Sequence, residues 1–295
     1  ESILPHYLRS CTCFLLCAFL FFALSFHGFY SRFARVVTLY ALLQNNIGRY
    51  VFSRAQIEQF ELDDEVDTIA MKAAELLRSA NNPKDKGAGG EPGEILLYLF
   101  LEQKLGAPKL LSKIELKTAG NQYVFGSDGV HLLHSADGVQ LILGESKIVG
   151  DLKSAASNAF VSILKVQAEP ANEVRLVETS IFKEAFSKKE TAKYIKSLII
   201  PSKRDLSIAA DKAFGIFLGY TLGINAKGKS NQQYRDAVQA KMLSDISEIA
   251  PYIAKRIADN HLENYSFYFY ILPFDDAEHD RAAFINRLKG GGTRD

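Results

Sequence analysis

The chain has 295 residues, of which 47% are hydrophobic, so it can fold around a substantial core and is not a disordered tail. Lysine and arginine total 35 against 34 aspartate and glutamate residues, which excludes a strong overall field that would draw the chain onto nucleic acid or an anionic membrane. Any contact with DNA must therefore depend on local patches or on a partner.

The first 30 residues differ in composition from the rest. The run from Cys11 to Phe26 is almost wholly apolar and holds all three cysteines of the chain, which argues against a disulfide scaffold or a zinc ribbon and favours apolar filler. It is shorter than the roughly 20 apolar residues of a membrane-spanning helix. Three interpretations stay open: a short anchor with membrane contact through residues 11–26, a buried helix, or a stretch not native to the folded unit. We expect a cytoplasmic protein.

Residues 31–80 are predicted to form a helical N-terminal layer, with helices at 34–46 and 55–80. In the second helix Ile69, Ala73 and Leu76 recur near a period of 3.6. Residues 81–93 contain two prolines, four glycines and several charges, a composition typical of a surface linker.

Residues 94–295 carry the pattern of an α/β domain. A helix is expected from near Pro92 to Gly106, then strands at 114–118, 122–134 and 139–148, a helix at 151–166, a strand at 173–179 and a lysine-rich helix at 182–198. The order α-β-β-β-α-β predicts a mixed central sheet flanked by helices. Beyond it we expect a strand at 214–222, a helix at 232–260 interrupted at Pro251, a strand at 265–272 and a short helix at 281–288.

A hairpin brings together the candidate catalytic residues. Asp137-Gly138 is a preferred loop pair for a two-residue turn, and this register sets Asp128 opposite Lys147. Shifting the loop by one residue sets Asp128 opposite Glu145. Because side chains alternate, Glu145 and Lys147 share one face, and Asp128 is expected on that face in both registers. Two carboxylates and a lysine then converge, although a surface pair at a strand end would explain the hairpin alone equally well.

Glu94 adds a third acidic side chain. It heads the apolar stripe of the helix that starts near Pro92, where a carboxylate requires a partner. Complementing the helix dipole is the alternative explanation, and it is about as good for Glu94 taken by itself.

These motifs resemble the PD-(D/E)xK nuclease superfamily. Gly93-Glu94, the segment from Gly126 to His131 and Leu143-Gly144-Glu145-Ser146-Lys147, followed by a helix from Asp151, carry the resemblance. More narrowly, the chain is similar to HamA, the nuclease subunit of the Hachiman antiphage defence system, from about residue 44 to 274. Ser127 stands where the superfamily's name has proline, a departure without chemical consequence.

The resemblance implies a restriction-endonuclease-like core and a DNA endonuclease or nickase. It implies that Asp128 and Glu145 bind Mg²⁺ or Mn²⁺, that Lys147 orients the attacking water, and that Glu94 completes the acidic cluster. It also implies a HamB-like helicase as partner, and no small-molecule cofactor.

Other basic residues and His131 are weaker candidates. Lys153, Lys188 and Lys189 could contact DNA, but a solvated helix face is the ordinary explanation for such lysines. His131 is three residues after Asp128, so it points to the opposite face of a regular strand, which favours a structural hydrogen bond over metal ligation. The competing function is a non-catalytic adaptor that keeps the nuclease fold and binds a helicase or a nucleic-acid complex.

Overall fold

A six-stranded sheet forms the centre of the chain in the computed structural model, which describes residues 13–15, 32–80, 90–112, 114–115, 127–135, 138–168, 188–199 and 210–288. Its strand order is β1-β6-β5-β4-β3-β2. The strands are β1 (Cys13–Leu15), β2 (Lys109–Ser112), β3 (Gly129–Ser135), β4 (Gly138–Ile148), β5 (Asp211–Thr221) and β6 (Ser266–Phe274).

Strand direction changes at β4. The neighbours β2, β3 and β4 pair antiparallel, whereas β4, β5, β6 and β1 pair parallel. β5 and β6 are apolar along most of their length and buried on both faces, as expected of parallel strands covered by helices. The sheet is therefore mixed, and its β3–β4 hairpin is the part nearest to the candidate catalytic residues.

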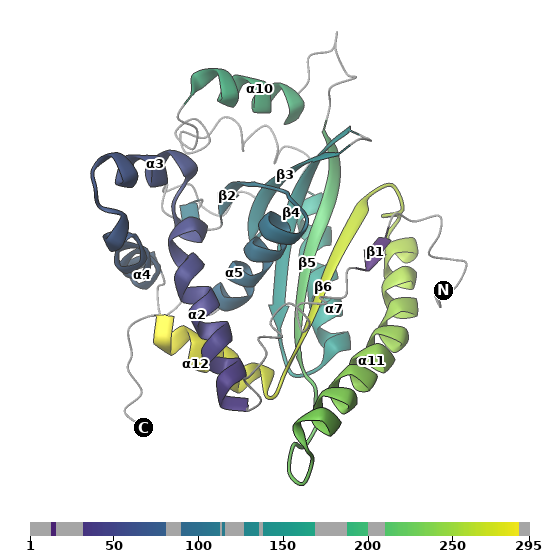
Figure 1. Ribbon diagram of the computed structural model, residues 1–295. Helices are drawn as coiled ribbons and strands as arrows, with labels where there is room; N and C mark the ends of the chain where they lie inside the picture. Colours follow the sequence, from purple (N-terminus) through teal and green to yellow (C-terminus); the bar gives the residue numbers. More distant parts are fainter. Residues whose placement is uncertain are drawn as a thin grey trace.

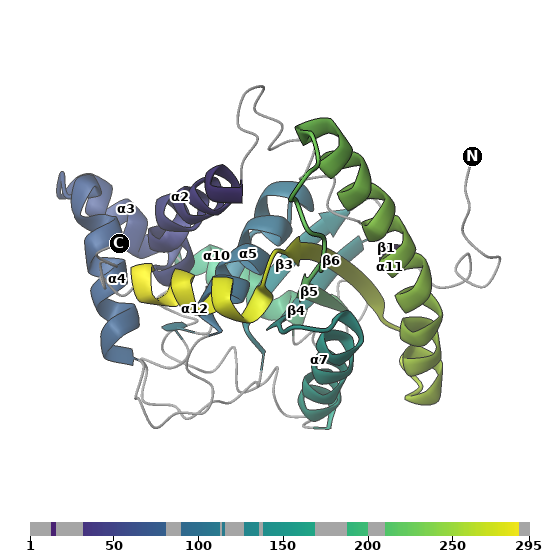
Figure 2. The same cartoon turned by 90° about the horizontal axis from the view of Figure 1, so that it is seen from below.

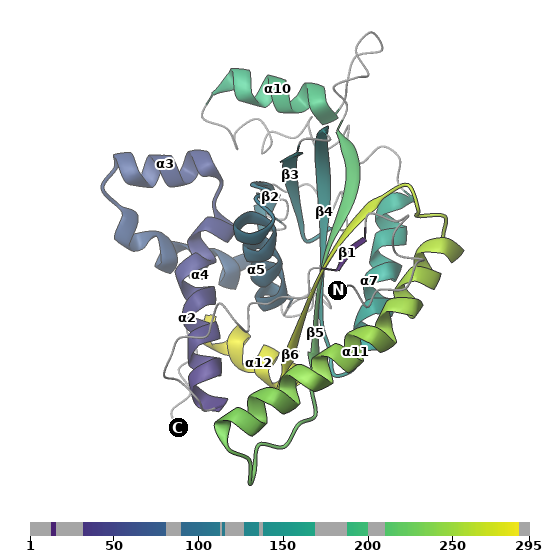
Figure 3. The ribbon, with the colours of Figure 1, turned by 45° about the vertical axis from the view of Figure 1, so that its right-hand side comes forward.

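Helices cover both faces of the sheet (Figures 1 and 3). On one face lie α7 (Leu152–Gln167) and α11 (Asn231–Asp259), and their apolar side chains share a core with Leu141, Leu143 and Ile216. On the other face lie α5 (Glu91–Leu99), its continuation η3 (Phe100–Lys104) and α12 (Ala277–Leu288).

The N-terminal helices form an outer layer on the α5 side, seen from below in Figure 2. They are α2 (Arg32–Val51), α3 (Arg54–Leu62), the short 3₁₀ helix η2 (Val66–Thr68) and α4 (Ile69–Ala80). Leu43, Ile47 and Tyr50 of α2 are buried in the same core as α5. Helix α10 (Lys189–Ile199) lies beyond the end of the sheet where β4 begins (Figure 1).

The predicted α/β class with a mixed sheet between helices is confirmed. Of the two hairpin registers, the second is present, because Gly129 pairs with Gly144 and Ser135 with Gly138. The prediction that Asp137 and Gly138 form the two-residue loop is therefore wrong. Gly138 belongs to β4, and the connection consists of residues 136 and 137.

Three element predictions were wrong in detail. The strand expected from Ile114 is replaced by β2 at Lys109–Ser112, and Ile114 is helical. The helix expected at 55–80 is broken at Asp64, whose φ of 57° no helix accommodates. The interruption expected at Pro251 is absent, since α11 runs through it.

The last residues assigned to the linker are helical, because α5 begins at Glu91. Pro92 is in the first turn of this helix, where a backbone N–H would have no partner within the helix, so its absence costs nothing. Residues 81–89 of that linker, the strand expected at 173–179 and the parts of other elements at 116–118, 122–126 and 182–187 lie outside the described residues.

The apolar N-terminal segment contributes β1, whose backbone pairs parallel with β6 at Phe267, Tyr268 and Phe269. These residues are a strand and not the buried helix that was one of the open interpretations. None of the helices in the described parts of the chain combines the length and apolar composition needed to cross a membrane.

Candidate active site

Four candidate residues lie where the β3–β4 hairpin meets the N-terminus of α5. Glu145 and Lys147 are on β4, Asp128 directly precedes β3, and Glu94 is in the first turn of α5. The three carboxylates are buried, with exposed fractions of 4% for Glu145 and 6% each for Asp128 and Glu94. Burial of an isolated carboxylate is costly, so each one requires donors or a cation.

Lys147 forms an ion pair with Glu145 through Nζ and Oε1. The two residues share the sheet face of Leu141 and Leu143, as predicted from the alternation of side chains. The Glu145 side chain is 5% exposed and that of Lys147 is 28% exposed. The ion pair therefore extends from a buried carboxylate to an ammonium group that is partly exposed to solvent.

Asp128 is held at the end of the antiparallel ladder. Its N–H donates to Gly144 O at 2.7 Å, and its Oδ2 accepts from Ser146 N at 2.7 Å and Ser146 Oγ at 2.8 Å. Ser146 alternates with Glu145 and Lys147, so its hydroxyl lies on the α5 face.

The strand pattern predicted that Asp128 would lie on the same face as Glu145. Instead, its carboxylate accepts a hydrogen bond from the Ser146 hydroxyl, which lies on the α5 face. The reason is that Asp128 occupies a bend before β3, where the period of two no longer directs its side chain.

Glu94 accepts a hydrogen bond at Oε2 from the hydroxyl of Tyr50, with an O–O distance of 2.5 Å. The preceding residue, Gly93, lets the helix approach β4, because a Cβ there would lie 3.1 Å from Ser146 Oγ. The first turn of α5 thus lies directly over the strand that carries Glu145 and Lys147.

Tyr50 is buried among acidic side chains. Burial raises the pKa of Tyr50 well above its usual value, and the negative charges of Glu94, Asp128 and Glu91 raise it further. The phenol is therefore protonated and donates to Glu94. Glu94 and the Asp128 carboxylate thus lie toward the α5 face of β4, and the ion pair of Glu145 with Lys147 lies on its α7 face.

The donor set fits a hard divalent cation such as Mg²⁺. Carboxylate oxygens are its preferred protein ligands, and a site in a nucleic-acid enzyme commonly uses one or two of them together with water and substrate phosphate. Within the described ranges, no group of three or more His, Cys, Asp or Glu side chains is arranged to hold a metal. Asp128, directly before β3, and Glu145, on β4, are the two carboxylates that would hold the ion, and Glu94 lies on the α5 side of the sheet.

A family model named HamA matches residues 24–288. The chain belongs to the HamA family. Searches of curated proteins and of solved structures return no match. The family implies a role in Hachiman antiphage defence, and the match spans both the hairpin with α5 and the N-terminal helices from α2 onward.

Two residues of this HamA chain that contact the candidate site were not found from the sequence. Ser146 lies between Glu145 and Lys147, and strand alternation gave it no role there because it points to the other face. Tyr50 lies 44 residues before Glu94. A tyrosine on a mainly apolar helix carries no signal of its contact with a distant carboxylate.

His131 has the structural role that the strand pattern favoured. It is 2% exposed, and its Nδ1 bonds to Ala107 O at 2.9 Å. Burial lowers its pKa to about 4. The imidazole is therefore neutral, and Nδ1 is the donor in that bond.

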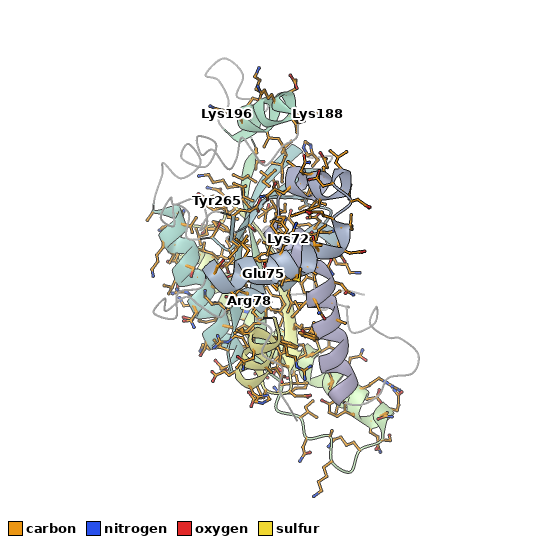
Figure 4. All side chains as sticks on the ribbon, turned by 90° about the vertical axis from the view of Figure 1, so that its left-hand side faces the viewer. Lys72, Glu75, Arg78, Lys188, Lys196 and Tyr265 are labelled. Carbon is orange, nitrogen blue, oxygen red and sulfur yellow. The ribbon has the colours of Figure 1, made fainter. Side chains whose placement is uncertain are left out.

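The candidate DNA-binding lysines are not brought together. Lys153, in the first turn of α7, is exposed, with Nζ 5.2 Å from the ring centroid of Tyr252. Lys188 and Lys189 are exposed at the start of α10. Figure 4 shows Lys196 on that helix and Lys188 directly before it, at one end of the molecule. Because α10 lies beyond the start of β4 and Glu145 is near its end, this basic face is remote from the candidate site.

Proposed function

We propose that this HamA chain is a Mg²⁺-dependent deoxyribonuclease, an endonuclease or nickase of the PD-(D/E)xK type. The observation that carries the proposal is the buried Glu145 in an ion pair with the partly exposed Lys147, with Asp128 at the end of the adjacent strand. The element order α5-β2-β3-β4-α7, with β5 pairing parallel to β4, supports the corresponding core.

Stability alone does not account for these charges. A buried ion pair contributes little net stabilisation, because desolvation of both groups offsets their attraction, and apolar residues of similar size often serve as well. Glu145 and Lys147 continue a strand whose preceding residues on that face, Leu141 and Leu143, are apolar. Function explains the change from apolar to charged residues better than packing does.

In this proposal Asp128 and Glu145 hold the cation, and Glu94 completes the acidic group. The bound Mg²⁺ supplies charge neutralisation at the phosphate and a water that is nucleophilic near neutral pH. Lys147 contributes a fixed positive donor for the attacking water or the scissile phosphate. Ser146 holds Asp128 by two hydrogen bonds, which restricts the carboxylate to one orientation.

The partner in this proposal is a HamB-like helicase that delivers or restrains the nuclease. The proposal rests on membership of the HamA family, and the net charge of +1 agrees with a nuclease that does not depend on its own electrostatic attraction to DNA.

Plasmid cleavage by Glu145→Gln and Lys147→Met tests the assignment. Both variants are expected to fold and to lose about 100-fold or more of the Mg²⁺-dependent rate, since each loses a charge that acts on the reacting phosphate. The assay is run with and without the helicase, and EDTA is expected to stop the reaction.

The matched control is Lys241→Met on α11. Lys241 pairs with the buried Asp245 much as Lys147 pairs with Glu145, but it lies outside the site. The control is expected to cleave as the unaltered chain does. Unchanged cleavage by either site variant would refute the assignment, and absence of any cleavage with the helicase present would favour the non-catalytic adaptor.

A further inference from the structure

Three large apolar side chains are exposed within ten residues of the N-terminal helical layer. They are Leu62 at the end of α3, Val66 in η2 and Met71 in α4, with exposed fractions of 80%, 51% and 59%. The other exposed large apolar side chains among the described residues lie singly on three different helices: Val161, Tyr194 and Leu243. Single exposed apolar residues are ordinary on a protein surface, whereas a group of them commonly marks a contact with another protein.

The same stretch of chain is strongly acidic. Between Arg54 and Lys72 there is no basic residue, and there are six acidic ones: Glu58, Glu61, Asp63, Asp64, Glu65 and Asp67. Five of the six are exposed, and Glu65 forms an ion pair with Lys72. Residues 58–71 therefore form one surface on which exposed apolar side chains alternate with negative charges, here called the acidic–apolar surface.

Side chains around this surface hold it in one arrangement. Ser53 caps α3 through a capping box with Gln56. Phe60 packs edge-on against Phe52, with ring centroids 5.0 Å apart, and Lys72 Nζ lies 4.8 Å from the centroid of the Phe60 ring. The exposed apolar side chains contribute little to this packing, because most of their area is in water. A surface that is ordered before it binds loses little conformational freedom on docking.

The acidic–apolar surface is on the outer side of the N-terminal layer. In Figures 1 to 3, α2 lies between α4 and α5. Figure 4 looks onto this side, on which Lys72, Glu75 and Arg78 of α4 are labelled. Because α2 and α5 separate this surface from the β3–β4 hairpin, a partner bound to it would leave the candidate site free for DNA.

The negative charge restricts which partner the surface can take. DNA is excluded, because its phosphates are repelled by the acidic side chains. Two copies of the chain joined through this same surface would also bring like charges together, since a two-fold interface places the same patch on both sides. The remaining occupant is a protein with positive charge around an apolar recess.

We propose that the acidic–apolar surface is the docking site for such a basic protein surface, and that this protein is the helicase of the proposed complex. The inference rests on the proposed function, which supplies the helicase. A protein that binds nucleic acid carries basic surfaces, which complement the charge of residues 58–67. The apolar side chains then supply most of the affinity, and the surrounding acids speed association.

Binding of the full chain to the helicase, measured by biolayer interferometry, tests the apolar part of the surface. Leu62→Ser combined with Val66→Ser changes positions that are exposed, so the fold is retained. We expect Kd to rise about tenfold or more. The matched control is Leu243→Ser on α11, which is 59% exposed and lies outside the surface, and it should bind as the unaltered chain does.

The acidic part is tested by Glu61→Gln combined with Asp64→Asn, which removes two charges and keeps the side-chain shapes. Asparagine also adopts the positive φ of 57° found at residue 64. The association rate should fall and depend less steeply on salt, as expected for charges at the rim of an interface. Glu248→Gln combined with Glu263→Gln removes the same charge from exposed positions elsewhere and should leave the salt dependence nearly unchanged.

The outcomes separate the docking site from the rest of the proposed function. Binding of the Leu62→Ser, Val66→Ser variant as tight as that of the unaltered chain would overturn the docking site alone. The same holds if analytical ultracentrifugation shows self-association of the isolated chain that this variant loses while it still binds the helicase, because the surface then serves a second copy. An unaltered chain that does not bind the helicase overturns both the docking site and the partnership. The nuclease assignment is decided separately, by plasmid cleavage with Glu145→Gln.

Discussion

At the scale of single residues, His131 shows how burial fixes a protonation state. Its imidazole donates to Ala107 O and packs 6.2 Å from the ring of Tyr98, and burial is the largest cause of its lowered pKa. The backbone hydrogen bond acts in the opposite direction but does not outweigh desolvation. The imidazole of His131 is therefore harder to protonate in the folded chain than in the unfolded chain.

This difference makes the free energy of unfolding depend on pH. His131 has a pKa of about 4 when folded and 6.5 in the absence of structure, so its contribution is present above pH 6.5 and is lost as the pH falls toward 4. The loss amounts to about 3 kcal/mol. In His131→Asn, whose amide can still donate to Ala107 O, the free energy of unfolding should fall less steeply over this range.

Urea unfolding of the variant and of the unaltered chain at several pH values between 7 and 4 measures the difference, in which the titration of shared carboxylates cancels. His134→Asn is the control, because His134 lies on the same strand but is exposed. Parallel pH curves for the unaltered chain and His131→Asn would contradict the predicted linkage.

At the scale of elements, local sequence patterns predicted the β3–β4 hairpin but not the side-chain direction of the residue that precedes it. Alternation placed Glu145 and Lys147 on one face of β4, since a residue inside a regular strand has its direction set by the backbone. Asp128 precedes the regular ladder, so its direction depends on hydrogen bonds to Ser146 that alternation does not encode. Prediction was accurate within the strand and failed one residue beyond it.

The same limit applies to helices. The start of α7 near Asp151 was predicted, and it depends on a local contact, because Asp151 accepts a hydrogen bond from Ser154 N at 2.7 Å. The continuation of α11 through Pro251 could not be predicted from the sequence. Proline lacks a backbone N–H, and tertiary contacts decide whether a helix continues past it. The contact of Tyr50 with Glu94 belongs to this second kind, and sequence analysis did not find it.

At the scale of the whole molecule, the site is distant from β1. In the sheet order, β1 lies at the edge beside β6, and β5 separates β6 from β4. Deleting residues 1–30 removes β1 but leaves α2, from Arg32 onward, and Tyr50 in place. We expect the shortened chain to stay in solution and to keep its Mn²⁺ affinity and its metal-dependent cleavage.

Size-exclusion chromatography and Mn²⁺ titration of the deletion variant check this expectation. Aggregation would show that β1 protects the edge of β6, since an uncovered strand edge is a template for pairing between chains. Lost metal binding in a variant that stays monomeric would show that the segment contributes to the folded unit around the site.

The balance of charge over the whole chain leads to a prediction about DNA binding. Binding strength from counterion release grows with the number of phosphates that a protein neutralises, at a slope of about −0.9 per phosphate in log affinity against log salt. With a net charge of +1 and the basic face of α10 remote from Glu145, the isolated chain should bind DNA weakly at physiological salt, with a shallow salt slope.

Attachment to a helicase would raise the local concentration of DNA at the site without new contacts by the nuclease itself. The isolated chain, the complex, and the complex with an ATPase-dead helicase are compared at matched salt for DNA binding and cleavage. We expect efficient cleavage only from a complex whose helicase engages DNA. Tight binding and full cleavage by the isolated chain would contradict delivery by the helicase, and it would leave the assignment of Asp128, Glu145 and Lys147 intact, because that assignment depends on the geometry of the hairpin and not on how DNA arrives.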